Sequence, residues 1–133
     1  MRSWISLARE AAQCGETYAK IVPTTHGARV QFTDARHQRI FALVTERGIE
    51  IDSVVIGAVR AQELGLLKVL LLACEDNHER NLVEFLLDRR RRLVGRIRIH
   101  RTEPGADELA YCITRLAREC DRMEYQLSGR DIE

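Results

Sequence analysis

The last third of the chain carries a long apolar stripe. Its members recur at the i, i+3, i+4, i+7 spacing of one helix face: Leu109, Cys112, Ile113, Leu116, Cys120, Met123 and Leu127. The arginines of this segment lie off the stripe, as in an amphipathic helix. We expect the helix to begin near Asp107 and to stop at Ser128 and Gly129. Such a long apolar face needs an apolar surface of similar length to cover it.

Upstream, the hydrophobic period changes from that of a helix to that of a strand. Three runs rich in β-branched and aromatic residues, 28–32, 40–44 and 49–59, are separated by turn signals. In the third run Glu50 and Asp52 alternate with isoleucines, so we expect one face of this strand to be exposed to solvent and the other to be buried. The pattern predicts a three-stranded antiparallel meander.

A short helix and a second pair of strands complete the predicted elements. Residues 3–13 are amphipathic, and the first of them is a serine that can cap a helix. The runs 82–87 and 93–99 flank a polar turn and predict a β-hairpin. With a further helix over 61–77, the order is α-β-β-β-α-β-β-α. The sequence therefore predicts an α+β fold in one domain, 1–133, with helices packed on an antiparallel sheet.

The helix predicted over 61–77 is apolar nearly all round. One stripe consists of Leu64, Leu67, Leu71 and Cys74, and a neighbouring stripe consists of Leu66, Val69, Leu70 and Ala73. A helix with so much apolar surface is covered on more than one side. Its own sheet accounts for one side. Either a partner subunit or the rest of the same chain accounts for the other.

This order of elements resembles the type III secretion chaperone-like (YbjN-like) family of bacterial proteins. The order of elements is similar over about 28–131, and the amino-acid sequence itself is similar in the last third of the chain. There, 88–96 resembles the family's hairpin, 107–109 the start of its last helix, and 116–131 its ending. The turn of the hairpin departs from the family, because it carries four arginines where relatives more often have an Asp-Gly turn.

The resemblance implies a protein that binds without catalysis. Members of the secretion-chaperone branch dimerise through the central helix and hold an extended segment of a client protein against apolar patches. By this resemblance the dimer interface would include Leu66, Val69, Leu70 and Ala73, and the client-binding surface would include Val30, Phe32 and Phe41. The resemblance thus predicts a homodimeric chaperone-like or adaptor protein that holds a segment of a client protein.

The predicted hairpin is strongly basic. Its arginines are Arg89, Arg90, Arg91, Arg92, Arg96 and Arg98, and Arg101 follows them. They could make several phosphate contacts, but no aromatic residue for base stacking lies among them. An acidic protein partner held by Arg–carboxylate pairs, or a solvated turn, fits them equally well. The alternative function is therefore a nucleic-acid-associated or stress-related regulator that uses this basic patch.

The sequence contains no catalytic or metal-binding signature. None of the four histidines is spaced with another His or a Cys as in a known motif, and the four cysteines lack the pairs of a zinc site. A net charge of +1 does not favour a dedicated nucleic-acid binder. No stretch approaches the roughly 18 apolar residues of a membrane span, and no secretory signal is recognised. We therefore expect a cytoplasmic protein that is not an enzyme and uses no metal or other cofactor.

Overall fold

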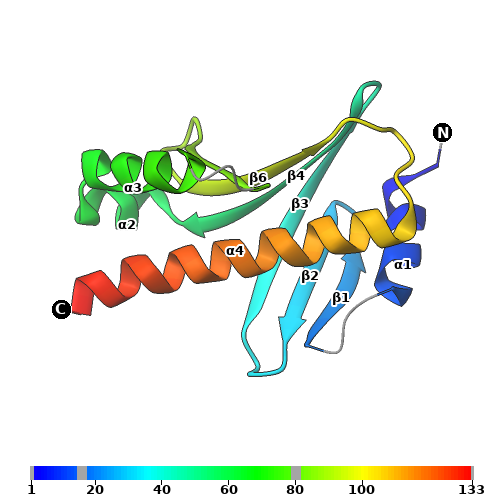
Figure 1. Cartoon of the computed structure of the whole chain (residues 1–133), viewed down its shortest axis with the longest axis horizontal. Helices are drawn as coiled ribbons and strands as arrows, with labels where there is room; N and C mark the ends of the chain where they lie inside the picture. Colours follow the sequence, from blue (N-terminus) through cyan, green and yellow to red (C-terminus); the bar gives the residue numbers. More distant parts are fainter. Residues whose placement is uncertain (1, 15–17, 79–81, 133) are drawn as a thin grey trace.

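The computed structural model describes residues 2–14, 18–78 and 82–132, with all their side chains except those of 78 and 128–132. Its elements, in chain order, are α1 (Trp4–Gln13), β1 (Ala19–Thr24), β2 (Gly27–Phe32), β3 (His37–Thr45), β4 (Gly48–Ile56), α2 (Ala58–Leu64), α3 (Leu66–His78), β5 (Glu84–Leu87), β6 (Leu93–Ile99) and α4 (Ala106–Ile132). Helices and a single sheet form one α+β unit (Figure 1), which confirms the predicted fold class.

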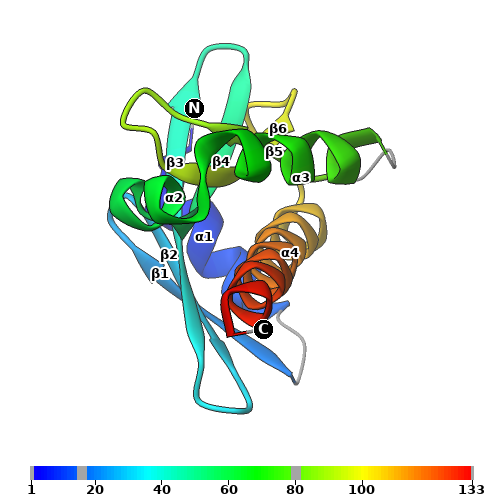
Figure 2. The same cartoon turned by 90° about the vertical axis from the view of Figure 1, so that its left-hand side faces the viewer.

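The six strands form one antiparallel sheet in the order β1-β2-β3-β4-β6-β5. Helix α1 packs on β1 and β2, while α4 crosses the sheet and packs mainly on β4, β6 and β3 (Figures 1 and 2). Helix α3 contacts β5 at the end of the sheet. Strand β1 has no counterpart among the predicted elements, because its alternation is brief and includes Pro23. Proline is tolerated there because β1 is an edge strand.

The core lies between α4 and the face of the sheet that α4 covers. Cross-strand neighbours on that face are buried, as the pairs Ile21–Val30 and Ile51–Ile97 show. The whole predicted stripe of α4, from Leu109 onward, is buried as well. The sheet is therefore the apolar surface that the amphipathic pattern of this helix requires.

Two predicted helices have different bounds in the structure. The helix expected over 61–77 is divided into α2 and α3, because Gly65 adopts a φ of 93° that residues with a Cβ rarely adopt. Helix α4 does not stop at Ser128 and Gly129 but continues to Ile132. A glycine inside a helix costs only about 1 kcal/mol, which the packing of the preceding turns can offset.

Helix α4 approaches the sheet very closely at Gly95 of β6. A Cβ on this glycine would lie 2.5 Å from Sγ of Cys120 on α4, 3.1 Å from Cγ1 of Val83 and 3.2 Å from Cε1 of Phe85. Real side chains do not approach so closely, so α4 rests on β6 only because residue 95 lacks a side chain.

We predict that Gly95→Ala lowers the free energy of unfolding by about 1–3 kcal/mol, because the added methyl group forces α4 away from β6. Urea denaturation of both single variants and of Gly95→Ala/Cys120→Ala measures the effect. Removing the sulfur should relieve part of the strain, with a coupling of at least about 0.5 kcal/mol. If the losses in free energy of unfolding of the two single variants add up to that of the double variant, the two residues do not limit the approach of the helix.

Candidate binding surfaces

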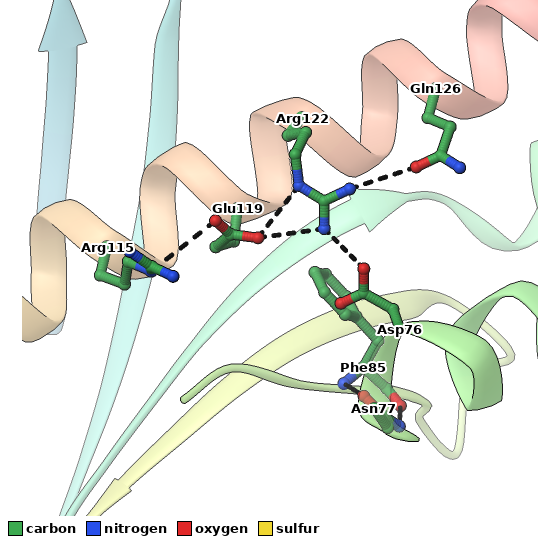
Figure 3. A network of polar contacts seen from close by, with 7 residues as sticks. All are labelled: Asp76, Asn77, Phe85, Arg115, Glu119, Arg122 and Gln126. Carbon is green, nitrogen blue, oxygen red and sulfur yellow. Dashed lines mark hydrogen bonds and ion pairs between the residues drawn. The ribbon is translucent and has the colours of Figure 1, made fainter. Parts of the chain in front are cut away.

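Helix α3 is attached to α4 by an ion pair that reaches across the structure (Figure 3). Arg122 donates from Nη2 to Oδ1 of Asp76 at 2.7 Å and from Nε to Oε2 of Glu119 at 3.0 Å. Its remaining nitrogen, Nη1, donates to Gln126. The side chain of Asp76 is only 11% exposed, so this pair is better shielded from water than an ordinary surface pair. The pair fixes α3 relative to the helix that covers the core.

A second attachment joins α3 to β5. The side-chain amide of Asn77 donates from Nδ2 to the carbonyl of Phe85, and its Oδ1 accepts the Phe85 N–H, both at 2.8 Å (Figure 3). One side chain thus makes the two backbone hydrogen bonds that a neighbouring strand would make at this residue. Because Asp76 and Asn77 both bond to other elements, they fix the rotation of α3 about its own axis. They therefore also fix which face of α3 points away from the sheet.

The outward face of α3 is apolar. Leu67, Leu71 and Leu70 are 72%, 58% and 40% exposed, and Cys74 is exposed beside them. Their spacing places all four on one side of the helix. We call these four residues the α3 patch. Large apolar side chains gathered on one exposed face are typical of interaction surfaces.

The α3 patch differs from the dimer interface predicted from the sequence. Val69 and Ala73 are buried, and Leu66 packs partly against the core, so only Leu70 of the four predicted residues is exposed. The assignment of Val69 and Ala73 was wrong because this stripe faces β5 and the core. Periodicity alone does not show which of two adjacent apolar stripes on a helix faces the core.

The sheet face opposite α1 and α4 forms the second candidate surface. On β3, Phe41 and Leu43 are 49% and 59% exposed, and the arginines Arg29 and Arg39 are exposed nearby. In the described residues, both α1 and α4 pack on the other side. We call this surface the open face.

Two depressions on the open face meet at Phe41. The larger, about 740 Å³, lies between β3, β4 and the β5–β6 turn, and the smaller, about 360 Å³, lies over β1, β2 and β3. Phe41 lines both of them. An elongated ligand could therefore contact this ring while it occupies both depressions.

The three predicted client-binding residues do not lie together. Val30 is buried and Phe32 is partly buried against the core, whereas Phe41 belongs to the open face. The register explains the difference: Val30 pairs with Gln38, which is also buried, and Phe41 lies three residues further along β3. Only Phe41 lies on a surface as predicted. Which residues of a strand face that surface depends on its register with the neighbouring strand, and the turn between the two strands sets this register.

The predicted basic patch divides into paired and unpaired arginines. Arg96 donates from Nε and Nη2 to the two carboxylate oxygens of Asp52 at 2.8 and 3.0 Å, and Glu50 lies 3.1 Å from the same Nε. Arg98 also contacts Glu50, at 3.5 Å. The hydrogen bond to Asp52 is the main reason that the pKa of Arg96 is raised. These arginines balance the carboxylates of the open face.

Asp88 organises the turn of the hairpin. One of its oxygens accepts the backbone N–H groups of Arg90 and Arg92, both at 2.9 Å, and the other accepts Nε of Arg92 at 2.7 Å. Arg91 adopts a φ of 62°, which the turn requires. Partial burial would raise the pKa of Asp88, but these hydrogen bonds outweigh it and the pKa lies below its ordinary value. The exposed guanidinium groups of Arg89, Arg90 and Arg91 have no ion-pair partner in the described part of the chain.

The cysteines divide into two buried and two exposed thiols. Burial raises the pKa of Cys120 to about 12 and also raises that of Cys112, so neither forms a thiolate readily. Cys14 and Cys74 are exposed. Within residues 2–14, 18–78 and 82–132, no cluster of three His, Cys, Asp or Glu side chains is arranged to hold a metal ion. The described helices include none that is long and apolar enough to cross a membrane.

No protein-family model and no curated protein matches the sequence of this chain.

We predict that Asp88→Asn lowers the free energy of unfolding by about 1–2 kcal/mol at neutral pH, since it removes a charged acceptor of three hydrogen bonds. The folded-state pKa is depressed, so the carboxylate stabilises the fold fully above its unfolded pKa of about 3.9. The advantage of the wild type should disappear as the pH falls through the lower folded-state value. Urea denaturation at several pH values measures the difference.

The matched control for Asp88→Asn is Glu46→Gln, in the exposed turn between β3 and β4. This change removes one negative charge from another turn and should alter the stability by less than about 0.5 kcal/mol. Equal effects of the two substitutions would mean that Asp88 acts only through the net charge of the protein.

Proposed function

We propose that this protein is a non-catalytic, chaperone-like binding module that forms a homodimer through the α3 patch and holds a segment of another protein on the open face. The observation that carries the proposal is the row of exposed leucines on α3, Leu67, Leu70 and Leu71. The resemblance of the sequence to the type III secretion chaperone-like family, in which the central helix dimerises, supports the same assignment.

The α3 patch suits a symmetric pair. In a twofold dimer the same patch lies on both subunits, so an apolar surface can cover its own copy. Full burial of one leucine contributes about 1.5–3 kcal/mol, and two copies of the patch would bring six leucines together. The attachment of α3 through Asp76 and Asn77 keeps the patch in place, so little order has to be gained on association.

The open face suits a client segment. Phe41 and Leu43 offer apolar contact beside the two depressions, and the surrounding arginines offer hydrogen-bond donors. The proposal places this activity in the cytoplasm, a reducing compartment in which the exposed thiols of Cys14 and Cys74 would persist.

We predict that Leu67→Lys/Leu71→Lys converts the protein from a dimer to a monomer at micromolar concentration. The two side chains are mostly exposed in the single chain, so the substitution should leave the fold intact while it places charges inside the interface. Sedimentation equilibrium gives the mass, and circular dichroism confirms that the variant is folded. Its dimer dissociation constant should rise at least about tenfold, which corresponds to 1.4 kcal/mol.

The matched control for the dimer is Leu43→Lys, because Leu43 is similarly exposed but lies on the open face. This variant should remain dimeric. Alkylation of Cys74 gives a second measure: on dilution below the dissociation constant it should become faster, while alkylation of Cys14 should not change. A wild-type protein that sediments as a monomer throughout the micromolar range would contradict the proposal.

A further inference from the structure

We infer that the segment held on the open face is acidic, with carboxylate side chains on both sides of an apolar residue that packs on Phe41. This inference rests on the proposed function and specifies the chemistry of its ligand. It is carried by two groups of unpaired arginines, one at each depression, with Phe41 between them.

The first group is a pair of like charges. Arg29 of β2 and Arg39 of β3 are direct cross-strand neighbours, and both line the smaller depression. Both are exposed, and neither has an ion-pair partner among the described residues. Like charges directly opposite each other destabilise a strand pair. A carboxylate bound between the two guanidinium groups would remove this repulsion.

The second group lies on the hairpin. Arg89 and Arg90 line the larger depression, together with Arg92 and Arg96. The last two are already paired with carboxylates, so Arg89 and Arg90 are the arginines left for a ligand. Their backbone is held by the Asp88 turn. The hairpin thus presents two cations at the opposite side of Phe41 from Arg29 and Arg39.

The acidic residues of the open face do not cancel these charges. Asp52 and Asp88, which line the larger depression, accept hydrogen bonds from arginines of the chain itself. Glu50 is shared between Arg96 and Arg98, and Glu84 lies directly opposite Arg96 on the neighbouring strand. On the open face, the positive charge that remains unpaired therefore lies at the two depressions, which favours a negatively charged ligand by electrostatic complementarity.

The small number of aromatic rings favours a peptide over a nucleic acid. Among the residues that line the two depressions, Phe41 is the one Phe, Tyr or Trp, and the imidazole of His26 at the smaller depression is the one other ring. Single-stranded nucleic acids are usually bound by several rings that stack successive bases. An extended peptide rises about 3.3 Å per residue, and needs only one apolar contact between its charged side chains.

The test uses the full-length protein and fluorescein-labelled probes in an anisotropy titration at low salt. The first probe is a twelve-residue peptide of Glu and Leu residues separated by Ser and Gly, and the second replaces every Glu with Gln. A third probe is a single-stranded DNA of twelve thymidine nucleotides, called the thymidine strand. The acidic peptide should bind at least about tenfold more tightly than the Gln peptide, since one charge-assisted hydrogen bond contributes that much. Added salt should weaken its binding.

Two double variants locate the site: Arg29→Gln/Arg39→Gln and Arg89→Gln/Arg90→Gln. Each should weaken binding of the acidic peptide at least about fivefold, because each removes one of the two charged contacts. The matched control, Arg9→Gln/Arg47→Gln, changes the net charge equally at exposed positions outside both depressions and should bind as the wild type does. Equal thermal midpoints confirm that all variants fold.

Each other outcome overturns the inference. Equal affinity for the acidic and Gln peptides would exclude a preference for acid and leave the proposed client binding in place. Tighter binding of the thymidine strand, lost in the same variants, would identify the open face as a nucleic-acid surface. An equal loss in the control variant would mean that only net charge matters. If neither peptide binds, the inference and the client-binding part of the proposed function both fail, whereas dimerisation is judged separately by sedimentation.

Discussion

Burial of one face of α4 against β3, β4 and β6 decides where the other parts of the structure lie. Its large apolar side chains, each contributing about 1.5–3 kcal/mol when fully buried, supply a large share of the core. The same helix carries Arg122, to which α3 is attached through Asp76. Because α1 and α4 occupy one face of the sheet, neither of them covers the other face. A single packing contact therefore defines both candidate surfaces.

Ion pairs have different roles in different parts of this protein. The Arg122–Asp76 and Arg96–Asp52 pairs join separate elements, and both involve partly buried carboxylates. Such pairs set geometry more than they add stability, since desolvation offsets much of their attraction. Arg29 and Arg39 differ because they face each other rather than an acid. On the open face, these two arginines together with Arg89 and Arg90 have no ion-pair partner among the described residues, and this is the face on which we propose that a client segment binds.

Hydrophobic period predicted the helices and strands apart from β1 and the division between α2 and α3. It failed where a choice between two equivalent patterns was needed. The stripe from Leu109 to Leu127 predicted α4 because only one face of that segment is apolar. Helix α3 has two apolar stripes, and the sequence offered no reason to prefer Leu67 and Leu71 over Val69. The choice depends on tertiary contacts, among them the Asp76–Arg122 ion pair, which links residues 46 positions apart in the chain.

The candidate site was predictable only in part for the same reason. The arginines of the hairpin were evident from the sequence, but their pairing with Asp52 and Glu50 depends on the register of β4 and β6. Phe41 was identified as a surface residue, while Val30 was placed on the wrong face of the sheet. A one-residue change of register exchanges the two faces of a strand. The Arg29–Arg39 opposition has no local signal at all.

The hydrogen bonds that Asn77 makes with Phe85 also limit how copies of this protein can assemble. The border strand β5 has its polar backbone groups satisfied at that residue, and on the opposite border Pro23 has no N–H to donate. Neither border presents an uninterrupted row of donors and acceptors to a further strand. The twofold contact that we propose for the α3 patch would close after two copies, whereas strand addition could continue into fibres. Both borders of the sheet are thus protected against open-ended strand addition, although the leucines of α3 are exposed.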